Sequence, residues 1–500
     1  MELVVTGVIV ALTLALLLYS RRSKVKHDRL PPGPPALPFL GNSLQIDKRA
    51  PDRSLIQLSR KYGPVFTVWL GPRPAVVLCG FEAVKEALVN QAEDFGARGT
   101  VPSIRKVTRG YGIASSNGFR SRQLRSFAIS ALRDFGKGAK SLEDFIRQEA
   151  ECLVEVFKKT GESPFDPTFQ LNSATANIMC AIVFGNRFDY EDPKLLALLR
   201  MIDENMKVIS SPWGQLYDLL PNLLDHLPGP HNRLFENADK IKNFLREMIQ
   251  LHKDTHTKGK RQDFIDSFLL RMKEEKNNPR SEFNDENLLL STFNIFLAGT
   301  DTTSSTMRWG LLLFLKYPEV QERIQSEIDQ VIGMERTPCI GDRERMPYTN
   351  AAIHEIQRYS NIIPLNLPHT VTKDTEFRGF LIPKGMIVIP LLASVLHDPC
   401  CWETPESFNV NHFLDERGQL KYKEAFLPFS IGNRMCIGEE VAQTQLFIFL
   451  TTLLQNFTVR SPLEPSAINV NPLSSGFSTL HHPYQLYCVP RKPVRRPGRE

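Results

Sequence analysis

The chain opens with one long apolar run that ends at a cluster of basic residues. Residues 3–19 carry no charge, and with residues 1 and 20 the run approaches the ~20 residues that cross a bilayer as a helix. The basic cluster follows the run, whereas a secretory signal peptide carries its positive charges before the apolar stretch. The pattern therefore predicts a single transmembrane signal anchor over residues 1–20, with the rest of the chain in the cytosol. A cleaved signal peptide is the alternative.

A proline-rich segment separates this run from the remainder of the chain. Residues 31–35 contain four prolines and one glycine, and proline fixes φ and cannot donate a backbone hydrogen bond. We expect residues 21–49, basic at first and proline-rich afterwards, to form a stiff spacer that holds a globular domain, residues 50–500, off the membrane. A linker without an orienting role fits the same residues.

Beyond the spacer, the pattern of apolar and polar positions is mainly helical. Two β-rich runs, residues 65–70 and 74–79, flank Gly71-Pro72 and predict a hairpin. Amphipathic stretches of helical period follow at residues 141–159, 237–253, 284–316, 319–332 and 348–360. Short β-like pieces occupy residues 375–390, and strand and helix do not alternate as in a doubly wound sheet. The sequence therefore predicts a mainly α fold with a small β region.

Composition and charge argue against several classes of protein. The 500 residues include 61 Lys and Arg against 55 Asp and Glu, a net charge of +6, which is mild for this length, and no dense basic tract indicates a nucleic-acid binder. The 8 cysteines are scattered without zinc spacing, so we expect most of them to be small buried side chains in a reducing compartment. No glycine-rich dinucleotide or phosphate-binding motif occurs.

One cysteine, Cys436, has an unusual neighbourhood. Gly432 and Gly438 flank it and permit close backbone approach, and Arg434 offers a cation suited to an acidic cofactor edge. A helix is predicted to begin just after Gly438, and its N-terminal dipole would favour the thiolate. An ordinary buried cysteine in a glycine-flanked turn is the alternative.

The segment from Phe429 to Gly438 matches every fixed position of Phe-x-x-Gly-x-Arg-x-Cys-x-Gly, the haem-binding signature of the cytochrome P-450 superfamily. The whole chain, with its anchor and proline hinge, resembles the vertebrate microsomal branch called family 2. The resemblance implies the haem-thiolate fold of that superfamily, haem b (iron protoporphyrin IX) as cofactor, Phe429 in the haem site and Cys436 as the iron ligand. It also implies a monooxygenase that inserts one oxygen atom from O₂ into lipophilic substrates such as xenobiotics, fatty acids or steroids, because a thiolate ligand favours O–O cleavage.

A polar cluster interrupts the longest apolar helix at residues 298–303. Ala298 and Thr302 are four residues apart and share a helix face, and Gly299 is expected to leave space there. We expect Thr302 to hold water or bound oxygen and Asp301 to deliver protons. A threonine bonded back to its own helix is the alternative, but the cluster resembles the superfamily's oxygen-activation signature.

The resemblance also assigns supporting residues. Glu355, Arg358 and His412 are expected to form a buried architectural network, in a stretch where Val410 replaces a common proline. The haem carboxylates need hydrogen-bond donors when buried, and the resemblance assigns this role to Arg98, Arg125, His369 and Arg434. The family usually shows Trp-x-x-x-Arg where this chain has Ser121 to Arg125, so the indole donor is absent.

The electrons must come from another protein, because the chain has no flavin or nicotinamide motif. The resemblance implies an NADPH-dependent flavoprotein reductase in the same endoplasmic reticulum membrane, with cytochrome b5 as a second possible donor. Basic residues that are candidates for a docking face, or for plain solvation, are Arg120, Arg122, Arg133 and Lys137. An apolar substrate pocket is expected from residues 101–111, 206–213, 293–297, 362–367 and 476–479. The rival functions are a haem-thiolate isomerase and a non-catalytic haem-binding sensor.

Overall fold

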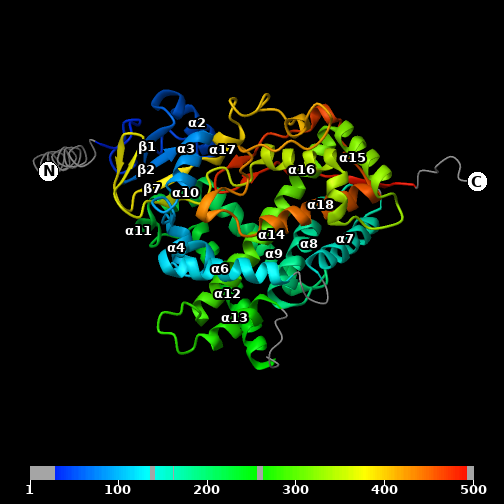
Figure 1. The fold of residues 1–500 in the computed structure, drawn as a ribbon, viewed down its shortest axis with the longest axis horizontal. Coiled ribbons are helices and arrows are strands. Elements are labelled where there is room, and N and C mark those ends of the chain that lie inside the picture. The colour runs from blue at the N-terminus through cyan, green and yellow to red at the C-terminus, as the bar shows by residue number, and fades with distance from the viewer. Residues whose placement is uncertain (1–28, 136–140, 162, 256–262, 493–500) are drawn as a thin grey trace, which may run out of the picture.

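The computed structural model describes residues 29–135, 141–161, 163–255 and 263–492 (Figure 1). The predicted anchor, residues 1–20, and the first part of the predicted linker lie outside the described residues. Across the described ranges, no helix combines the length and the apolar character that a membrane span requires. The described chain is mainly helical, and its main sheet lies at one side of the molecule (Figure 1). This confirms the predicted mainly α fold with a small β region.

Long helices form most of the structure. They are α2 (Pro51–Tyr62), α6 (Gly118–Phe135), α7 (Leu142–Lys159), α8 (Thr168–Phe184), α9 (Pro193–Ser210), α10 (Pro212–Leu219), α12 (Pro230–Thr255), α13 (Phe264–Glu274), α14 (Asp285–Lys316), α15 (Pro318–Val331), α16 (Pro347–Ser360) and α18 (Glu439–Asn456). Shorter helical segments are α3 (Phe81–Lys85), η1 (Glu86–Asn90), α4 (Pro102–Thr108), α5 (Gly112–Ser115), α11 (Pro221–Leu224), η2 (Ile340–Arg345), α17 (Leu392–Leu396), η3 (Val410–Phe413), η4 (Gly432–Arg434) and η5 (Pro465–Ala467).

The strands of the described residues are short and form one larger sheet and three pairs. The five-stranded sheet has the order β1-β2-β7-β4-β3, built from β1 (Val65–Leu70), β2 (Arg73–Leu78), β7 (Ile387–Pro390), β4 (His369–Thr370) and β3 (Ala97–Arg98). Among the strands of the described ranges, only β2 and β7 pair in parallel. The pairs are β5 (Thr375–Phe377) with β6 (Phe380–Ile382), β8 (Phe457–Arg460) with β11 (Tyr487–Pro490), and β9 (Ser474–Ser475) with β10 (Thr479–Leu480). The register of β3 on β4 sets Arg98 opposite His369.

The helix boundaries follow local signals in the sequence. Helix α7 begins after Ser141, which forms a reciprocal capping box with Asp144. Helix α14 begins after Asn284, whose side chain accepts the N–H of Asn287. Helix α12 differs from the prediction, because it starts at Pro230 rather than at residue 237. A proline at the first helical position is compatible with a helix start, and the periodicity argument missed these first turns, which are about two.

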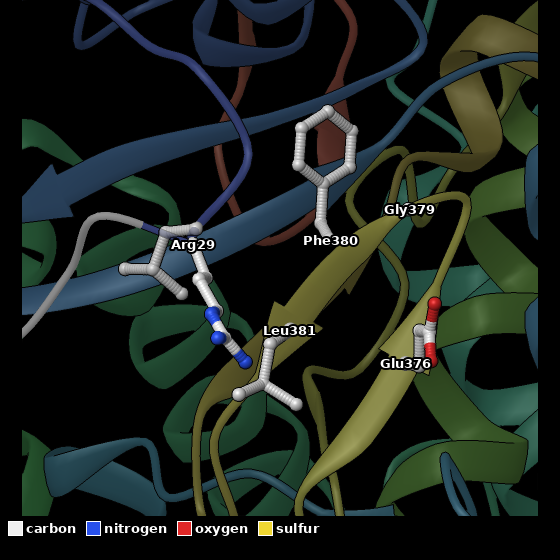
Figure 2. Close-up of a pocket in the computed structure, with 6 residues that line it drawn as sticks. Arg29, Glu376, Gly379, Phe380 and Leu381 are labelled. Carbon is white, nitrogen blue, oxygen red and sulfur yellow. The ribbon is translucent and has the colours of Figure 1, made fainter.

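The described end of the proline-rich segment is bound to the sheet. Thr67 of β1 donates its N–H to the carbonyl of Pro32 over 2.9 Å and its hydroxyl to that of Pro31 over 2.8 Å. Leu381 of β6 donates its N–H to the carbonyl of Arg29 over 3.0 Å, and an open pocket lies between Arg29 and the β5–β6 hairpin (Figure 2). This part of the segment is therefore attached to the folded body, and the domain boundaries at residues 20 and 49 stay predictions.

Helix α14 is the central element of the core. It contacts α5, α8, α12, α16 and α18, the last four of which are labelled around it in Figure 1, and most of its length is buried. The hydroxyl of Thr175 in α8 donates to the carbonyl of Thr300 over 2.9 Å. This bond and the packing of apolar side chains along both helices hold the polar cluster of residues 298–303 in the middle of the molecule.

Candidate functional site

Cys436 follows a tight turn that the chain closes on itself. Its N–H donates to the carbonyl oxygen of Phe429 over 2.9 Å, and Ser430 and Gly432 have positive φ values of 63° and 79°. A side chain at Gly432 would strike the carbonyl oxygen of Leu88 in η1, so only glycine fits there. The backbone that carries Cys436 is therefore held in one conformation.

The surroundings of the Cys436 sulfur combine exposure with weak solvation. Solvent reaches the Cys436 side chain, but protein atoms surround most of it and leave it poorly solvated. This poor solvation raises the pKa of the thiol, and the charge of Glu439 adds to the rise. The N–H of Gly438 and the charges of Arg125 and Arg98 oppose that rise. Helix α18 begins at Glu439, as the sequence predicts. A metal ligand must be deprotonated, and a metal cation at the sulfur supplies the missing stabilisation of the thiolate.

Three arginines gather around the peptide groups that precede Cys436. Arg98 donates through Nη2 to the carbonyl of Arg434 over 3.2 Å, and Arg125 donates through Nη2 to the carbonyl of Met435 over 2.7 Å. Burial, and then the charges of Arg434 and Arg125, lower the pKa of Arg98 to about 9. Burial and the charge of Arg125 lower the pKa of Arg434 to about 10. The three cations thus repel one another in a poorly solvated place.

These cations lack an anionic partner among the described residues. No Asp or Glu within the described ranges forms an ion pair with Arg98, Arg125 or Arg434, and Nε of Arg98 is buried without a hydrogen-bond partner. Buried charge of one sign is costly unless it is paired. The donor set therefore fits a bound group with more than one negative charge, and the two carboxylates of haem meet that requirement.

Four protein acceptors bind the Arg434 guanidinium, which leaves one of its five N–H groups, on Nη1, for another partner. Its Nε donates to the carbonyl of Gly96 over 2.7 Å, and its Nη2 donates to the carbonyl of Ser116 and to Oδ1 of Asn117, both over 2.9 Å. Its Nη1 donates to the hydroxyl of Ser121. Ser116 and Asn117 were not identified from the sequence. Two polar residues just before a helix are nevertheless a recognisable signal of a helix N-terminus.

His369 lies behind Arg98 and supports it. Burial, and then the charge of Arg98, lower the pKa of His369 to about 3, so its ring is neutral. Nδ1 is 2.7 Å from the carbonyl oxygen of Phe95 and donates to it, which leaves Nε2 to accept from Nη1 of Arg98 over 3.0 Å. Both ring nitrogens of His369 are used within the protein, and its expected donation to a haem carboxylate stays a prediction.

The open side of α14 is marked by Ala298 and Thr302. Ala298 is exposed in the middle of a mostly buried helix, and Thr302 is half-buried one turn further on. The hydroxyl of Thr302 donates to the carbonyl of Ala298 over 2.7 Å, which is the alternative that the sequence left open. The expectation that Gly299 leaves space on this face is wrong, because a side chain there would strike Met179 of α8. Gly299 serves close helix packing instead.

Asp301 points away from Thr302 and into the protein. It is buried, and its Oδ1 lies 3.9 Å from Nη2 of Arg308. Burial raises the pKa of Asp301, while Arg308 opposes the rise and the charge of Asp203 adds to it. The carboxyl group therefore holds a proton more readily than an exposed aspartate does.

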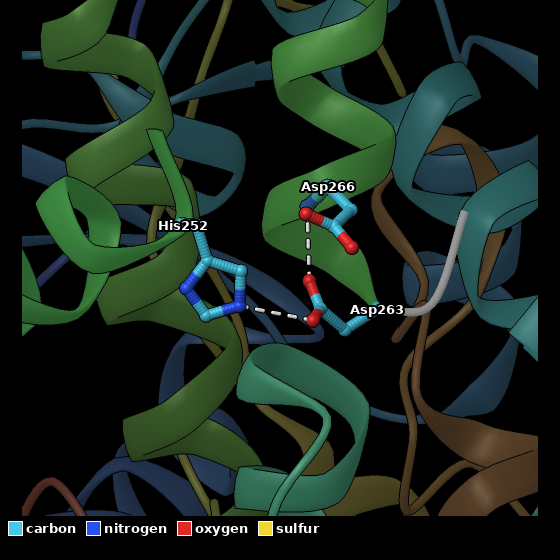
Figure 3. Close-up of side chains that lie close together, drawn as sticks. All are labelled: His252, Asp263 and Asp266. Carbon is cyan, nitrogen blue, oxygen red and sulfur yellow. Dashed lines mark hydrogen bonds and ion pairs between the residues drawn. The ribbon is translucent and has the colours of Figure 1, made fainter. Parts of the chain in front are cut away.

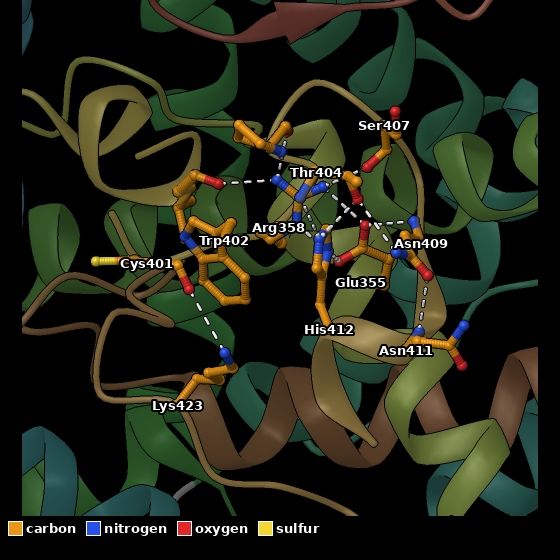
Figure 4. A network of polar contacts seen from close by, with 12 residues as sticks. Glu355, Arg358, Cys401, Trp402, Thr404, Ser407, Asn409, Asn411, His412 and Lys423 are labelled. Carbon is orange, nitrogen blue, oxygen red and sulfur yellow. Dashed lines mark hydrogen bonds and ion pairs between the residues drawn. The ribbon is translucent and has the colours of Figure 1, made fainter. Parts of the chain in front are cut away.

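Glu355, Arg358 and His412 form the network that the sequence predicts (Figure 4). Arg358 donates through Nε and Nη2 to the two carboxylate oxygens of Glu355, each over 2.7 Å, and His412 Nδ1 lies 3.1 Å from Oε2 of Glu355. The Arg358 guanidinium also donates to the carbonyls of Leu396, Pro405 and Ser407. The network ties α16 to the irregular segment that leads toward Cys436.

Val410 does not loosen this segment. It begins the 3₁₀ helix η3, and the side chain of Asn409 caps that helix by accepting the N–H of Asn411. The N–H of Asn409 donates to Oε1 of Glu355 over 2.7 Å. These bonds supply the rigidity that a proline would otherwise provide.

Several of the segments expected to line a substrate pocket meet in space. Ser478 donates its N–H to the hydroxyl of Ser210 at the end of α9 over 3.1 Å, and Thr479 donates its N–H to the carbonyl of Ile362 over 3.0 Å. The indole of Trp309 in α14 donates to the carbonyl of Thr479 over 3.2 Å. These bonds bring residues 206–213, 362–367 and 476–479 together beside α14.

The candidate docking residues differ in their surroundings, and one of them already has partners within the protein. Arg120 pairs with Glu282 over 2.7 Å and stacks over the ring of Tyr111. Arg122 and Arg133 are exposed. Lys137 lies outside the described residues.

A cluster of His252, Asp263 and Asp266 has the composition of a metal site (Figure 3). Its groups already bind one another: His252 Nε2 lies 3.0 Å from Oδ2 of Asp263, and Oδ1 of Asp263 accepts the N–H of Asp266. Burial lowers the pKa of His252, but the bond and charge of Asp263 outweigh it and raise the pKa to about 9. The cluster is therefore an ion pair that ties the end of α12 to the start of α13.

Comparison with known proteins agrees with the geometry around Cys436. The family model for cytochrome P450 matches residues 31–488. Cytochrome P450 2B4 of Oryctolagus cuniculus is 49% identical over 476 residues, which are 95% of this chain and 97% of that protein. Cytochrome P450 2G1 of the same organism is 48% identical over 95% of this chain and 96% of that protein, and cytochrome P450 2B19 of Mus musculus is 48% identical over 97% and 99%. The chain therefore belongs to the cytochrome P450 family and takes haem as its cofactor.

Proposed function

We propose that the chain is a membrane-bound monooxygenase that uses electrons from NADPH, delivered by a flavoprotein reductase, to oxidise lipophilic substrates. The observation that carries the proposal is the exposed Cys436 beside Arg98, Arg125 and Arg434, three arginines without a carboxylate partner in the described chain, of which Arg434 is buried and the other two are half-buried. Haem ligated by a thiolate supplies the activation of O₂ for insertion into C–H bonds. Cys436 would hold the iron, and Arg98, Arg125 and Arg434 would bind the haem carboxylates.

Protons would reach the reaction through α14. Because the Thr302 hydroxyl donates its own hydrogen to Ala298, its oxygen is free to accept a hydrogen bond from water on the open face of the helix. Asp301, whose pKa is raised by burial, would hold a proton on the inner side and pass it on through water. Ser305 supports this arrangement, because it accepts from Arg308 over 2.6 Å and so helps to place that arginine near Asp301.

Thr302→Ala is expected to waste reducing equivalents. Positioned proton transfer typically contributes 10²–10⁴-fold to a rate, and we expect product formed per NADPH to fall by about tenfold or more, with the lost electrons recovered as hydrogen peroxide. Substrate binding, measured by spectral shift, should change little. Thr306→Ala is the matched control, because Thr306 also bonds back to its own helix, to the carbonyl of Thr302 over 2.9 Å. Equal coupling in both variants would refute the role of Thr302.

We propose that side chains beyond the predicted anchor also contribute to membrane binding. Large apolar side chains are exposed at Phe39 and Leu44 after the proline-rich segment and at Leu223 and Leu227 near α11. The β1–β2 turn joins the two regions, because a Cβ at Gly71 would approach both Leu219 of α10 and the carbonyl of Phe39. We propose that these side chains rest on the lipid surface of the endoplasmic reticulum.

Deletion of residues 1–20 is expected to weaken membrane association without affecting haem incorporation, because the residues around Cys436 all lie beyond the linker. Some protein should stay with the membrane through the exposed apolar side chains, and Phe39→Ser with Leu44→Ser in the truncated chain should release it. Leu463→Ser, at another exposed leucine, is the control. Fractionation of membranes together with the haem-to-protein ratio checks the expectation. Loss of haem on truncation would show that the segment belongs to the fold.

We propose the substrate as a chemical class, that of lipophilic organic compounds. The expected pocket segments are largely apolar, and apolar pockets discriminate weakly between ligands of similar size. Fatty acids, steroids and xenobiotics all fit this chemistry. A spectral-shift binding screen over these three classes tests the assignment, and the absence of binding by any lipophilic compound would argue against it. Cytochrome b5 is proposed as an alternative electron donor.

A further inference from the structure

Helix α6 contacts the segment before Cys436 at two places. Arg125 donates to the carbonyl of Met435, and one helical turn earlier Ser121 accepts from Nη1 of Arg434. Ser121 is 4% exposed and Arg434 is 6% exposed, so water has little access to this hydrogen bond. Both contacts therefore help to set the position of α6 against the Cys436 turn.

The Ser121 hydroxyl completes the set of acceptors around the Arg434 guanidinium. Gly96 binds Nε, and Ser116 and Asn117 bind Nη2, so these contacts lie on one side of the planar group. Ser121 is the acceptor that the structure shows for Nη1 within the described residues. A guanidinium presents its donors in a rigid plane, and acceptors at three of its corners permit one orientation only.

We infer that Ser121 is a positioning residue for the cofactor: its hydroxyl fixes the Arg434 guanidinium against α6 and so aims it at a haem carboxylate. The inference rests on the proposed placement of haem at Cys436. It gives a physical role to the serine at the position where the family usually has tryptophan. In this chain the position serves the cofactor through Arg434 rather than by direct donation from an indole.

The surroundings of Ser121 also decide what a tryptophan would do there. The Arg434 guanidinium already lies against the small serine side chain, and a group as large as an indole would overpack this buried site, whereas the single added methyl group of threonine is a far smaller change. An indole would both remove the acceptor for Nη1 and compete with the guanidinium for space. Restoring the usual family residue is therefore expected to weaken haem retention rather than to improve it.

Two pairs of side chains at residue 121 separate the effect of the hydroxyl group from the effect of side-chain volume. Ser121→Ala removes only the oxygen, and Ser121→Thr against Ser121→Val compares a hydroxyl with a methyl group in side chains of the same shape. A hydrogen bond to a charged group contributes enough that its loss is expected to speed haem transfer to apomyoglobin by about tenfold or more. The alanine, valine and tryptophan variants should lose haem at such rates, and the threonine variant should stay close to the parent protein. Ser126→Ala, at an exposed serine of the same helix, should leave the rate unchanged.

The outcomes also distinguish this inference from the proposed function. Equal rates for serine and alanine, or for threonine and valine, would overturn the role of the hydroxyl even if the parent protein has a normal thiolate-type spectrum. Failure of the threonine variant to take up haem would show that space alone decides, and would equally overturn it. Uptake of haem by the threonine variant but not by alanine or valine would support the role. A parent protein that lacks the thiolate-type spectrum would instead refute the ligand assignment at Cys436.

Discussion

Cys436→Ser is expected to abolish the thiolate-type spectrum of the reduced carbonyl complex and to reduce oxygenation to background. A serine hydroxyl ionises far less readily than a thiol, so the strongly donating anionic ligand is lost. The arginines that would bind the haem carboxylates are untouched, because their contacts in this segment use backbone carbonyls and not the sulfur. Some haem is therefore expected to remain bound with an altered spectrum.

The exposed Cys400 offers a matched control for this substitution. Cys400→Ser should keep both the spectrum and the activity of the parent protein. Difference spectra of the reduced carbonyl complexes, recorded at equal haem concentration, give the comparison. Persistence of the thiolate-type spectrum in Cys436→Ser would mean that another residue ligates the iron.

Glu355→Gln is expected to prevent accumulation of the folded haem protein. The substitution leaves the Arg358 charge, whose side chain is 0% exposed, without its carboxylate, and breaking a buried ion pair in this way typically costs about 3–5 kcal/mol. That loss is a large part of the roughly 5–15 kcal/mol that stabilises a typical folded protein. Three backbone carbonyls and the N–H of Asn409 depend on the same network, so its loss should also loosen the segment that leads to Cys436.

Glu155→Gln is the matched control, since Glu155 pairs with Lys158 at the same helical spacing but on the surface, with side chains 66% and 51% exposed. Surface pairs contribute at most about 1 kcal/mol. The yield of haem protein and the midpoint of urea unfolding should therefore fall sharply for Glu355→Gln and hardly for Glu155→Gln. Similar values for the two variants would show that the buried network is not essential to the fold.

Local patterns in the sequence were sufficient for much of the fold. The apolar period of residues 284–316 predicted α14 almost to its ends, because an N-cap asparagine and a long buried stripe leave few alternatives. The start of α18 just after Gly438 followed from the same reasoning. The start of α12 at Pro230 was missed, because the polar residues of its first turns hide the periodicity.

The sequence named candidate site residues, which stay predictions, but it did not predict their contacts. Arg98 and His369 are far apart in the chain, and only the pairing of β3 with β4 places the histidine behind the arginine. Gly299 was assigned to the wrong face, because the approach of Met179 from α8 is a tertiary contact without a local signal. The bond from Arg434 to Ser121 likewise joins segments that no sequence pattern relates.

The central claim is that this chain couples NADPH oxidation to oxygen insertion, and the stoichiometry of the reaction tests it most directly. The full-length protein, combined with purified reductase and a lipophilic compound that gives a binding spectrum, is followed for NADPH and oxygen consumed and for product formed. A monooxygenase should consume NADPH and oxygen in equal amounts and form oxygenated product that carries label from ¹⁸O₂, with loss of product in Cys436→Ser. Rearrangement of a peroxide substrate without NADPH would indicate an isomerase, and haem binding without turnover would indicate a sensor. Either result would contradict the proposed function.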